Sequence, residues 1–202
     1  GEEWAMGSKT PTFVDIDSDG DQDLFIGAGP FFGQQEGTVY FYENTGTPEL
    51  AAFTLITNTY LGIVSPYYSQ MAPTFADIDG DGDPDFFMAI SSYDNQGQVR
   101  FYRNNGNATS PAWAYVTDNY MGIQARYLSF ADADGDGDLD MFTDREYYRN
   151  DGDATQPDWV LRGTPYGLAW SGGPPVLGDL LGNDGRPDLL LGGSGGVHLY
   201  RN

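Results

Sequence analysis

Three short stretches of the chain place aspartates at alternate positions, five to a stretch. They are DIDSDGDQD at residues 15–23, DIDGDGDPD at residues 77–85 and DADGDGDLD at residues 132–140, the first, second and third acidic loops. A loop with five carboxylates repels itself unless a cation lies among them. Calcium prefers six to eight oxygen ligands from carboxylates, backbone carbonyls and water. The spacing therefore predicts one calcium ion in each loop, about three in all.

Within each loop, we expect the carboxylates at positions 1, 3, 5 and 9 and the backbone carbonyl at position 7 to bind the ion, while a glycine at position 6 permits the sharp turn. The side-chain ligands are Asp15, Asp17, Asp19 and Asp23, then Asp77, Asp79, Asp81 and Asp85, then Asp132, Asp134, Asp136 and Asp140. The carbonyl ligands are those of Asp21, Asp83 and Asp138, and the turn glycines are Gly20, Gly82 and Gly137. The alternative is a set of acidic turns that hold no metal.

Two other kinds of metal site are disfavoured for these loops. An EF-hand needs a glutamate at position 12, where the second loop has Met88, and helical flanks, where this chain has strand-like segments. Magnesium is less suitable because it resists giving up water to an all-protein cage. Calcium is therefore the expected ion.

A fourth stretch, GDLLGNDGRPD at residues 178–188, is an incomplete copy that we name the fourth acidic loop. It retains Asp184 and Asp188 at positions 5 and 9, but Leu180 and Gly182 occupy positions 1 and 3 unless Asp179 reaches in across a one-residue insertion. This loop is expected to be a weak or vacant site.

The acidic loops belong to a repeat that occurs four times along the chain. A second marker follows each loop: TVYFYEN at 38–44, QVRFYRN at 98–104, REYYRN at 145–150 and GVHLYRN at 196–202. The asparagine that ends each marker suits an Asx turn, in which its side chain bonds the backbone two residues on. Each repeat reads as four short strands over roughly 50 residues, which is the size of a propeller blade.

The predicted fold class is therefore all-β, a propeller of four four-stranded blades in a single domain over residues 1–202. The blades cover approximately residues 11–60, 73–120, 128–162 and 175–202, the last completed by residues 1–7. The opening EEWAMG aligns with a fourth strand and would close the ring, which leaves no exposed sheet edge. The alternatives are that the chain is part of a larger propeller or that its first strand completes a blade of a neighbouring molecule.

These features carry a resemblance to a known family. The D-x-D-x-D-G-x-x-D hairpin, the DLFIGA-type strand after it and the F-Y-x-N-x-G exit resemble the FG-GAP/VCBS repeats, which are related to the blades of integrin alpha-subunit propellers. The resemblance covers nearly the whole chain. It implies an extracellular β-propeller with calcium in its blade hairpins, although this chain shows four blades rather than seven or eight. Members of the family include adhesion proteins, lectins and accessory domains of secreted enzymes.

The composition excludes several classes of partner and site. Nine basic residues against thirty acidic ones give a net charge of −21, which argues against nucleic acid and against anionic membrane surfaces. There is no apolar run of 18 residues, so no membrane insertion is expected. The chain has no cysteine and one histidine, His198, which excludes thiolate and imidazole-rich metal sites.

We expect a protein that binds without catalysing a reaction. There is no G-x-S-x-G elbow, phosphate-binding glycine loop or H-E-x-x-H motif. Because loops of this modular class bind calcium at about 10⁻⁴–10⁻³ M, they fill outside the cell and not in resting cytosol. The leading hypothesis is thus a secreted or cell-surface structural, adhesive or fibre-forming subunit. A carbohydrate-binding lectin is the alternative, and an accessory domain of a secreted polysaccharide-active enzyme comes third.

The partner is expected to be a protein or glycan at the cell surface, or a second copy of the chain. Aromatic side chains on loops suit sugar rings or protein partners, and the candidates for ligand binding are Phe31, Tyr67, Tyr68, Tyr93 and Trp170. By contrast, Tyr60, Tyr120 and Tyr166 recur in register and are expected to pack between blades. Asn107 begins the sequence Asn-Ala-Thr and is a candidate for N-glycosylation.

Overall fold

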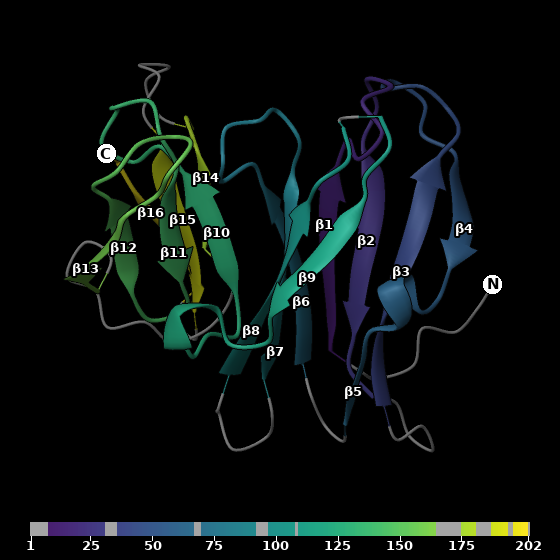
Figure 1. Cartoon of the computed structure of the whole chain (residues 1–202), viewed down its shortest axis with the longest axis horizontal. Coiled ribbons are helices and arrows are strands. Elements are labelled where there is room, and N and C mark those ends of the chain that lie inside the picture. The colour runs from purple at the N-terminus through teal and green to yellow at the C-terminus, as the bar shows by residue number, and fades with distance from the viewer. Residues whose placement is uncertain are drawn as a thin grey trace. The chain divides into compact units, whose positions relative to one another are not determined.

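The protein is built from four small antiparallel β-sheets, shown as arrows in Figure 1. The computed structural model describes residues 8–30, 36–66, 70–91, 97–107, 109–164, 175–180, 187–193 and 196–201. Across these ranges the strands are joined by turns and two short 3-10 segments, with no α-helix. The predicted fold class is confirmed in its all-β character and its four blade-type sheets. The strand expected at residues 1–7 to close the ring lies outside the described residues.

The chain divides into two compact units, Gly1–Phe75 with Gly82–Arg126, and Ala76–Asp81 with Tyr127–Asn202. The first unit contains two of the sheets. In the first sheet the strands lie in the order β1-β2-β3-β4, and β5 pairs with the part of β3 that β4 leaves open. The strands are β1 (Lys9–Val14), β2 (Asp23–Ala28), β3 (Glu36–Asn44), β4 (Phe53–Thr57) and β5 (Val64–Pro66). The sequence predicted the first four strands and missed β5.

The second sheet repeats this order as β6-β7-β8-β9. Its strands are β6 (Gln70–Ala76), β7 (Asp85–Ser91), β8 (Gly97–Asn104) and β9 (Trp113–Thr117). Both β3 and β8 shift register against the fourth strand at the same place in the repeat, between Phe41 and Tyr42 and between Phe101 and Tyr102. The 3-10 segments η1 (Tyr60–Gly62) and η2 (Tyr120–Gly122) follow the fourth strands.

An aromatic and aliphatic core joins the two sheets of the first unit. The ring of Tyr60 lies 5.0 Å from that of Phe25 in β2 and 6.0 Å from that of Phe86 in β7, both edge-on. The indole Nε1 of Trp113 donates a hydrogen bond of 2.7 Å to the Tyr60 hydroxyl, and burial raises the pKa of Tyr60 to about 12. The expectation that Tyr60 packs between blades is confirmed.

The equivalent tyrosine of the second blade packs on the equivalent rings of its own sheet, as Tyr60 packs on Phe25 and Phe41. The ring of Tyr120 lies 5.3 Å from that of Phe87 and 5.2 Å from that of Phe101, both in its own sheet. These contacts show a packing role for Tyr120 within its blade. The third tyrosine of the series, Tyr166, lies outside the described residues.

The second unit holds the other two sheets. One has the order β10-β11-β12-β13, and the other has β14-β15-β16 within the described residues. The strands are β10 (Leu128–Ala131), β11 (Asp140–Thr143), β12 (Tyr147–Asn150), β13 (Trp159–Gly163), β14 (Val176–Gly178), β15 (Asp188–Gly193) and β16 (Gly196–Tyr200). The Ser129 hydroxyl donates a hydrogen bond of 2.6 Å to the carbonyl of Pro175 and links the two sheets.

Candidate metal centre

Each acidic loop is the hairpin that joins the first two strands of a sheet. The first loop connects β1 to β2, the second connects β6 to β7, and the third connects β10 to β11. The strand after each loop is anchored in the core: every residue of β7 and of β11 is buried, as is every second residue along most of β2. The core therefore fixes the point at which each loop ends.

The turn at position 6 of each loop has the backbone geometry that the sequence predicted. The φ angles are 96° at Gly20, 91° at Gly82 and 99° at Gly137. A residue with a side chain is strained in this left-handed region, whereas glycine adopts it freely. The glycines thus let each loop turn back on itself, and the prediction about them is confirmed.

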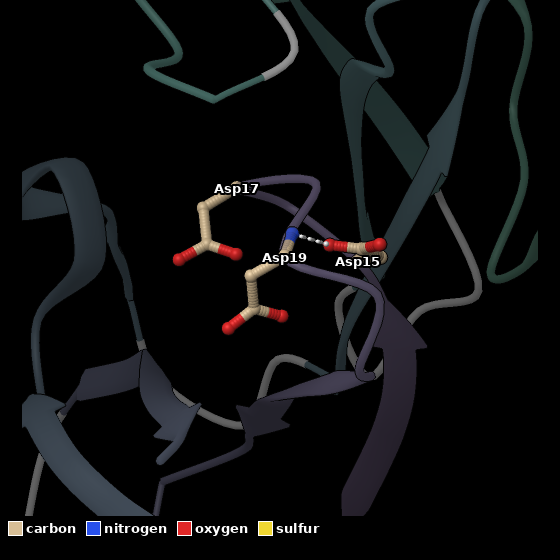
Figure 2. Close-up of side chains that lie close together, drawn as sticks. All are labelled: Asp15, Asp17 and Asp19. Carbon is tan, nitrogen blue, oxygen red and sulfur yellow. Dashed lines mark hydrogen bonds between the residues drawn. The ribbon is translucent and has the colours of Figure 1, made fainter. Parts of the chain in front are cut away.

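The first three aspartates of the first loop converge in space. One carboxylate oxygen from each of Asp15, Asp17 and Asp19 lies within 4.8 Å of the others. Figure 2 shows the Asp17 and Asp19 carboxylates projecting in the same direction, while the Asp19 amide donates to Asp15. The second oxygen of Asp15 accepts a bond of 3.1 Å from the Gly20 amide. Asp15 therefore holds the loop closed through backbone hydrogen bonds.

The same convergence occurs in the other two complete loops. The clusters are Asp77, Asp79 and Asp81, and Asp132, Asp134 and Asp136, each with one oxygen per residue inside the same 4.8 Å limit. Calcium holds oxygens at about 2.3–2.6 Å, so two of its ligands are at most about 5 Å apart. Each cluster therefore has the dimensions of part of a calcium coordination sphere.

The aspartate at position 9 ties each loop to the third strand of its sheet. Its Oδ1 accepts a hydrogen bond from the backbone N–H of the asparagine that ends that strand. The pairs are Asp23 with Asn44 at 2.7 Å, Asp85 with Asn104 at 2.8 Å and Asp140 with Asn150 at 2.8 Å. Because these aspartates are at most 2% exposed, the link is shielded from water.

The first loop contains a buried oxygen that the protein itself leaves unsatisfied. The Oδ2 of Asp23 is buried and has no hydrogen-bond partner. Burial raises the pKa of Asp23 to about 6, the backbone amides of Asn44 and Ile16 oppose the rise, and repulsion from Asp17 and Asp19 adds to it. A buried carboxylate without a partner is unfavourable unless a cation neutralises it. This oxygen therefore fits a calcium ion bound among the first-loop carboxylates.

The third loop also contains buried carboxylates that neighbouring carboxylates repel. Burial and repulsion from Asp136 raise the pKa of Asp138 to about 6, and burial also raises the pKa of Asp140. A partial counter-charge is present, because a guanidinium nitrogen of Arg149 lies 3.7 Å from a carboxylate oxygen of Asp134. An ion in the third loop would thus compete with a cation of the chain itself.

Among the described residues of the fourth loop, no cluster of three carboxylates is found. Asp188 is buried and its Oδ2 accepts a hydrogen bond of 2.9 Å from the Leu180 amide, whereas Asp179 is exposed. Asp184 lies outside the described residues. The prediction of a weak or vacant fourth site stays a prediction.

Two features of the loops were missed from the sequence. The side chains at position 7, those of Asp21, Asp83 and Asp138, are buried with 6–8% of their surface exposed, although only their carbonyls were assigned a role. The second feature is the bond from position 9 to the third strand. The recurrence of an asparagine at the end of every third strand was the signal for it.

The asparagine side chains do form the expected turns. Asn44 Oδ1 accepts hydrogen bonds from the amides of Gly46 at 3.1 Å and Ala52 at 2.8 Å, and Asn104 and Asn150 make the equivalent bonds. The Asx turns predicted at these three positions are therefore confirmed. Each one connects an acidic loop, through position 9, to the turn that leads into the fourth strand.

The remaining candidates lie partly outside the described residues. This is the case for every ligand-binding candidate, namely Phe31, Tyr67, Tyr68, Tyr93 and Trp170. Asn107 is exposed, and its Oδ1 accepts hydrogen bonds from the Thr109 amide and hydroxyl at 3.1 and 2.9 Å. His198 is exposed on β16. In the described part of the chain, no helix has the length and apolar character that a membrane span requires.

Comparison with known proteins identifies the repeat. A family model described as an FG-GAP-like repeat matches residues 15–88 and again residues 77–143. The two matches together cover well over half of the 202 residues, and each begins at the first aspartate of an acidic loop. No curated protein and no solved structure matches the chain.

Proposed function

Because the chain belongs to the FG-GAP-like repeat family, we propose that it is a non-catalytic, calcium-stabilised propeller module that acts outside the cell as a structural or adhesive subunit. The observation that carries the proposal is the convergence of three carboxylates within 4.8 Å in each of three hairpins. The buried, unpartnered Oδ2 of Asp23 supports it independently, since it needs a positive charge nearby.

A bound calcium ion would supply the positive charge that the clustered carboxylates lack. The chain's own residues would supply the ligands and connect the ion to the sheet. The carboxylates at positions 1, 3, 5 and 9 and the carbonyl at position 7 would hold the ion, and position 9 also links it to the third strand through the bond between Asp23 and Asn44 and its equivalents. Occupying the loop therefore stiffens three strands of a sheet at once, so that ion binding contributes to folding.

The extracellular location follows from the affinity expected of such loops. Modular sites of this kind bind calcium with dissociation constants of about 10⁻⁴–10⁻³ M, so extracellular calcium near millimolar occupies about half of the sites or more, and resting cytosolic calcium leaves them empty. The protein would be stable and rigid outside the cell and weakened inside it.

A role in binding other proteins is supported by apolar side chains on the outer strands. On β4, Leu55 and Ile56 are about half exposed, and on β9, Tyr115 and Val116 are slightly more exposed. Exposed apolar surface of this kind is typical of protein contacts when it is contiguous. The lectin alternative depends on aromatic residues outside the described part of the chain, so no separate proposal is made for it.

Calorimetric calcium titration of the chelator-treated protein, combined with thermal melts, tests the proposal. We expect about three ions with dissociation constants of about 10⁻⁴–10⁻³ M and a clear fall in melting temperature on chelation. Light scattering in calcium would show concentration-dependent assembly if the subunit builds fibres. The proposal fails if the melting curve is the same before and after exhaustive dialysis against EGTA and mass spectrometry finds no bound calcium.

A further inference from the structure

The first sheet has one packed face and one partly exposed face. Phe25 in β2 and Val39 in β3 are fully buried on the packed face. The second sheet covers them there, and the ring of Phe75 in β6 lies 4.6 Å from that of Phe25. On the opposite face, Phe13 and Leu55 are 55% and 49% exposed. One side of this sheet is therefore covered by a neighbouring sheet, and the other presents large apolar side chains to water.

Strand pairing makes the exposed face continuous. Leu24 lies opposite Phe13 in β1 and opposite Tyr42 in β3, and Tyr42 lies opposite Leu55 in β4, so these side chains project to the same side. Phe53 extends the row, because its ring lies 6.1 Å from that of Phe13. We name this surface the first end face, made of Phe13, Leu24, Tyr42, Phe53 and Leu55. Contiguous exposed apolar surface typically marks a contact with another molecule.

The second sheet shows what covers a face of this kind. Its PTFAD segment repeats the PTFVD of the first sheet, so Phe75 takes the place of Phe13, and Phe86 takes the place of Leu24 directly after the last aspartate of the loop. Phe86 is fully buried in the core shared with Phe25, whereas Leu24 is partly exposed. The cover of the second sheet is thus the packed face of the first. The occupant that fits the first end face is therefore the opposite face of another blade.

The fourth sheet exposes that opposite face. Val197 in β16 stands at the position of Val39 in the repeat, but Val39 is fully buried and Val197 is 70% exposed. Val176 in β14 is 51% exposed, whereas Leu189, on the other side of the sheet, is fully buried. Val176 pairs with Leu190, and Leu190 with Leu199, so they share a side. We name this surface the second end face, made of Val176, Leu190, Val197 and Leu199.

We propose that the first end face of one chain docks on the second end face of a second copy of this chain. The contact would repeat the one between the first two sheets, with Phe13 against Leu190 of the second copy, as Phe75 lies against Phe25. Such a head-to-tail contact joins two different surfaces. The inference rests on the proposed function in one respect, since it names the partner of the structural subunit.

The area of the contact favours a closed pair of chains. A sheet of three or four strands, about 4.8 Å apart and about 17 Å long, has roughly 250–300 Å² on each face. One contact between two faces would bury roughly 500–600 Å², which is below the roughly 1,000 Å² that a specific interface needs. Two chains closed head to tail make the contact twice and reach this area. Their eight sheets are within the four to eight blades typical of propellers.

The contact between copies would be less polar than the contacts between sheets of one chain. The Thr12 hydroxyl donates a hydrogen bond of 2.7 Å to the Pro73 carbonyl between the first two sheets, and Ser129 makes the equivalent bond to Pro175. Val176 stands at this position in the fourth sheet and has no hydroxyl. Burial of apolar surface would therefore hold the copies together, and we expect a dissociation constant on the order of 1–10 μM.

Sedimentation velocity of the full chain in calcium tests the proposal. The wild-type protein should change from the 22.1 kDa of one chain to twice this mass as its concentration passes the dissociation constant. Phe13→Glu and Val197→Glu each place a charge in both contacts of the closed pair and should weaken assembly at least tenfold. Leu161→Glu is the matched control, because it adds the same charge at a residue 52% exposed on the outer strand β13. It should leave assembly unchanged.

Cysteine cross-linking identifies which surfaces meet, because the wild-type chain has no cysteine. The double variant Phe13→Cys with Leu190→Cys should form a disulfide-linked dimer on mild oxidation, and reductant should release it. Phe13→Cys alone should not cross-link, whereas a contact between two first end faces would link it. Phe13→Cys with Leu161→Cys is the control for random collision and should also stay unlinked.

Three results would overturn the inference. They are a single-chain mass at every concentration, undiminished assembly of Phe13→Glu or Val197→Glu, and a disulfide of the double variant within one chain, which would mean that the chain covers its own end faces. Failure of the proposed function is separable, because it is read from calcium titration. A dimer that binds no calcium would reject the calcium-stabilised module and retain the contact, and a monomer that binds three ions would do the reverse.

Discussion

Replacing Asp23 with asparagine is expected to change stability in opposite directions with and without calcium. Without calcium, the wild-type protein keeps a carboxylate at 2% exposure with one oxygen unpartnered. The asparagine variant removes this charge and keeps an oxygen that can accept the Asn44 amide, as Asp23 does at 2.7 Å. With calcium, the same change removes a proposed ligand.

Without calcium, the gain in stability of the Asp23→Asn variant can be calculated from the pKa of Asp23, which rises from 3.8 to about 6. At 1.36 kcal/mol for each pKa unit this corresponds to at most about 3 kcal/mol. The neighbouring carboxylates are partly exposed to water, and solvent screening reduces this free-energy difference to about 1 kcal/mol. Since 1 kcal/mol shifts the melting temperature of a chain this long by about 2–4 °C, the metal-free variant should melt about 2–4 °C above wild type.

With calcium, the comparison reverses. An ion at a hundred times its dissociation constant stabilises the folded state by about 2.7 kcal/mol. Asparagine offers a neutral oxygen in place of a carboxylate, so we expect the first loop to lose most of this contribution. The variant should then be about 1–2 kcal/mol less stable than wild type.

Differential scanning calorimetry of both proteins, metal-free and at 10 mM calcium, measures the two comparisons. Asp188→Asn is the matched control, because it makes the same change at position 9 of the fourth loop and should leave the calcium-induced gain intact. If the Asp23 variant is less stable in both conditions, or gains as much from calcium as wild type does, the argument that Asp23 needs an ion is wrong.

Three further predictions concern charge and packing. The folded, metal-free protein holds protons on Asp23 and Asp138 up to about pH 6, above the ordinary range of an aspartate. Its free energy of unfolding should therefore rise as the pH falls from 7 to 5. Calorimetry should show a higher melting temperature at pH 5 than at pH 7, and a lower one would contradict the burial of these two carboxylates. Arg149→Gln removes a cation 3.7 Å from Asp134 and should raise third-loop calcium affinity by up to about fivefold, as measured by titration; weaker binding would show that Arg149 helps to shape the site. Tyr60→Phe leaves the Trp113 indole without its acceptor and should cost about 1 kcal/mol in thermal melts with or without calcium; an unchanged melting temperature would refute the role of this bond.

Much of the candidate site could be predicted because it is local in the chain. Asp15, Asp17 and Asp19 lie within five residues, and Gly20 adopts a φ of 96° that turns the loop back on itself. Short-range geometry then brings the three carboxylates within 4.8 Å of one another. The blade strands could be predicted equally well, because alternating apolar residues and turn residues mark them within a few positions.

The features that were missed depend on contacts between distant residues. The bond from Asp23 to Asn44 joins residues 21 apart and requires the register of β2 with β3. The short strand β5 forms only where β4 leaves part of β3 unpaired. No local pattern encodes either feature, because both arise from how strands pair.

The sequence by itself determined the four repeats, the blade strands other than β5 and the aspartates that converge in the acidic loops, because spacing along the chain governs each of these. Only the tertiary structure decided which carboxylates are buried. Asp23 and Asp138 look like any other aspartate of their loops in the sequence, and their raised pKa values come first from burial. The cavity of about 250 Å³ that Ile78, Leu139 and Trp159 line likewise exists only because segments distant in the sequence fold against one another.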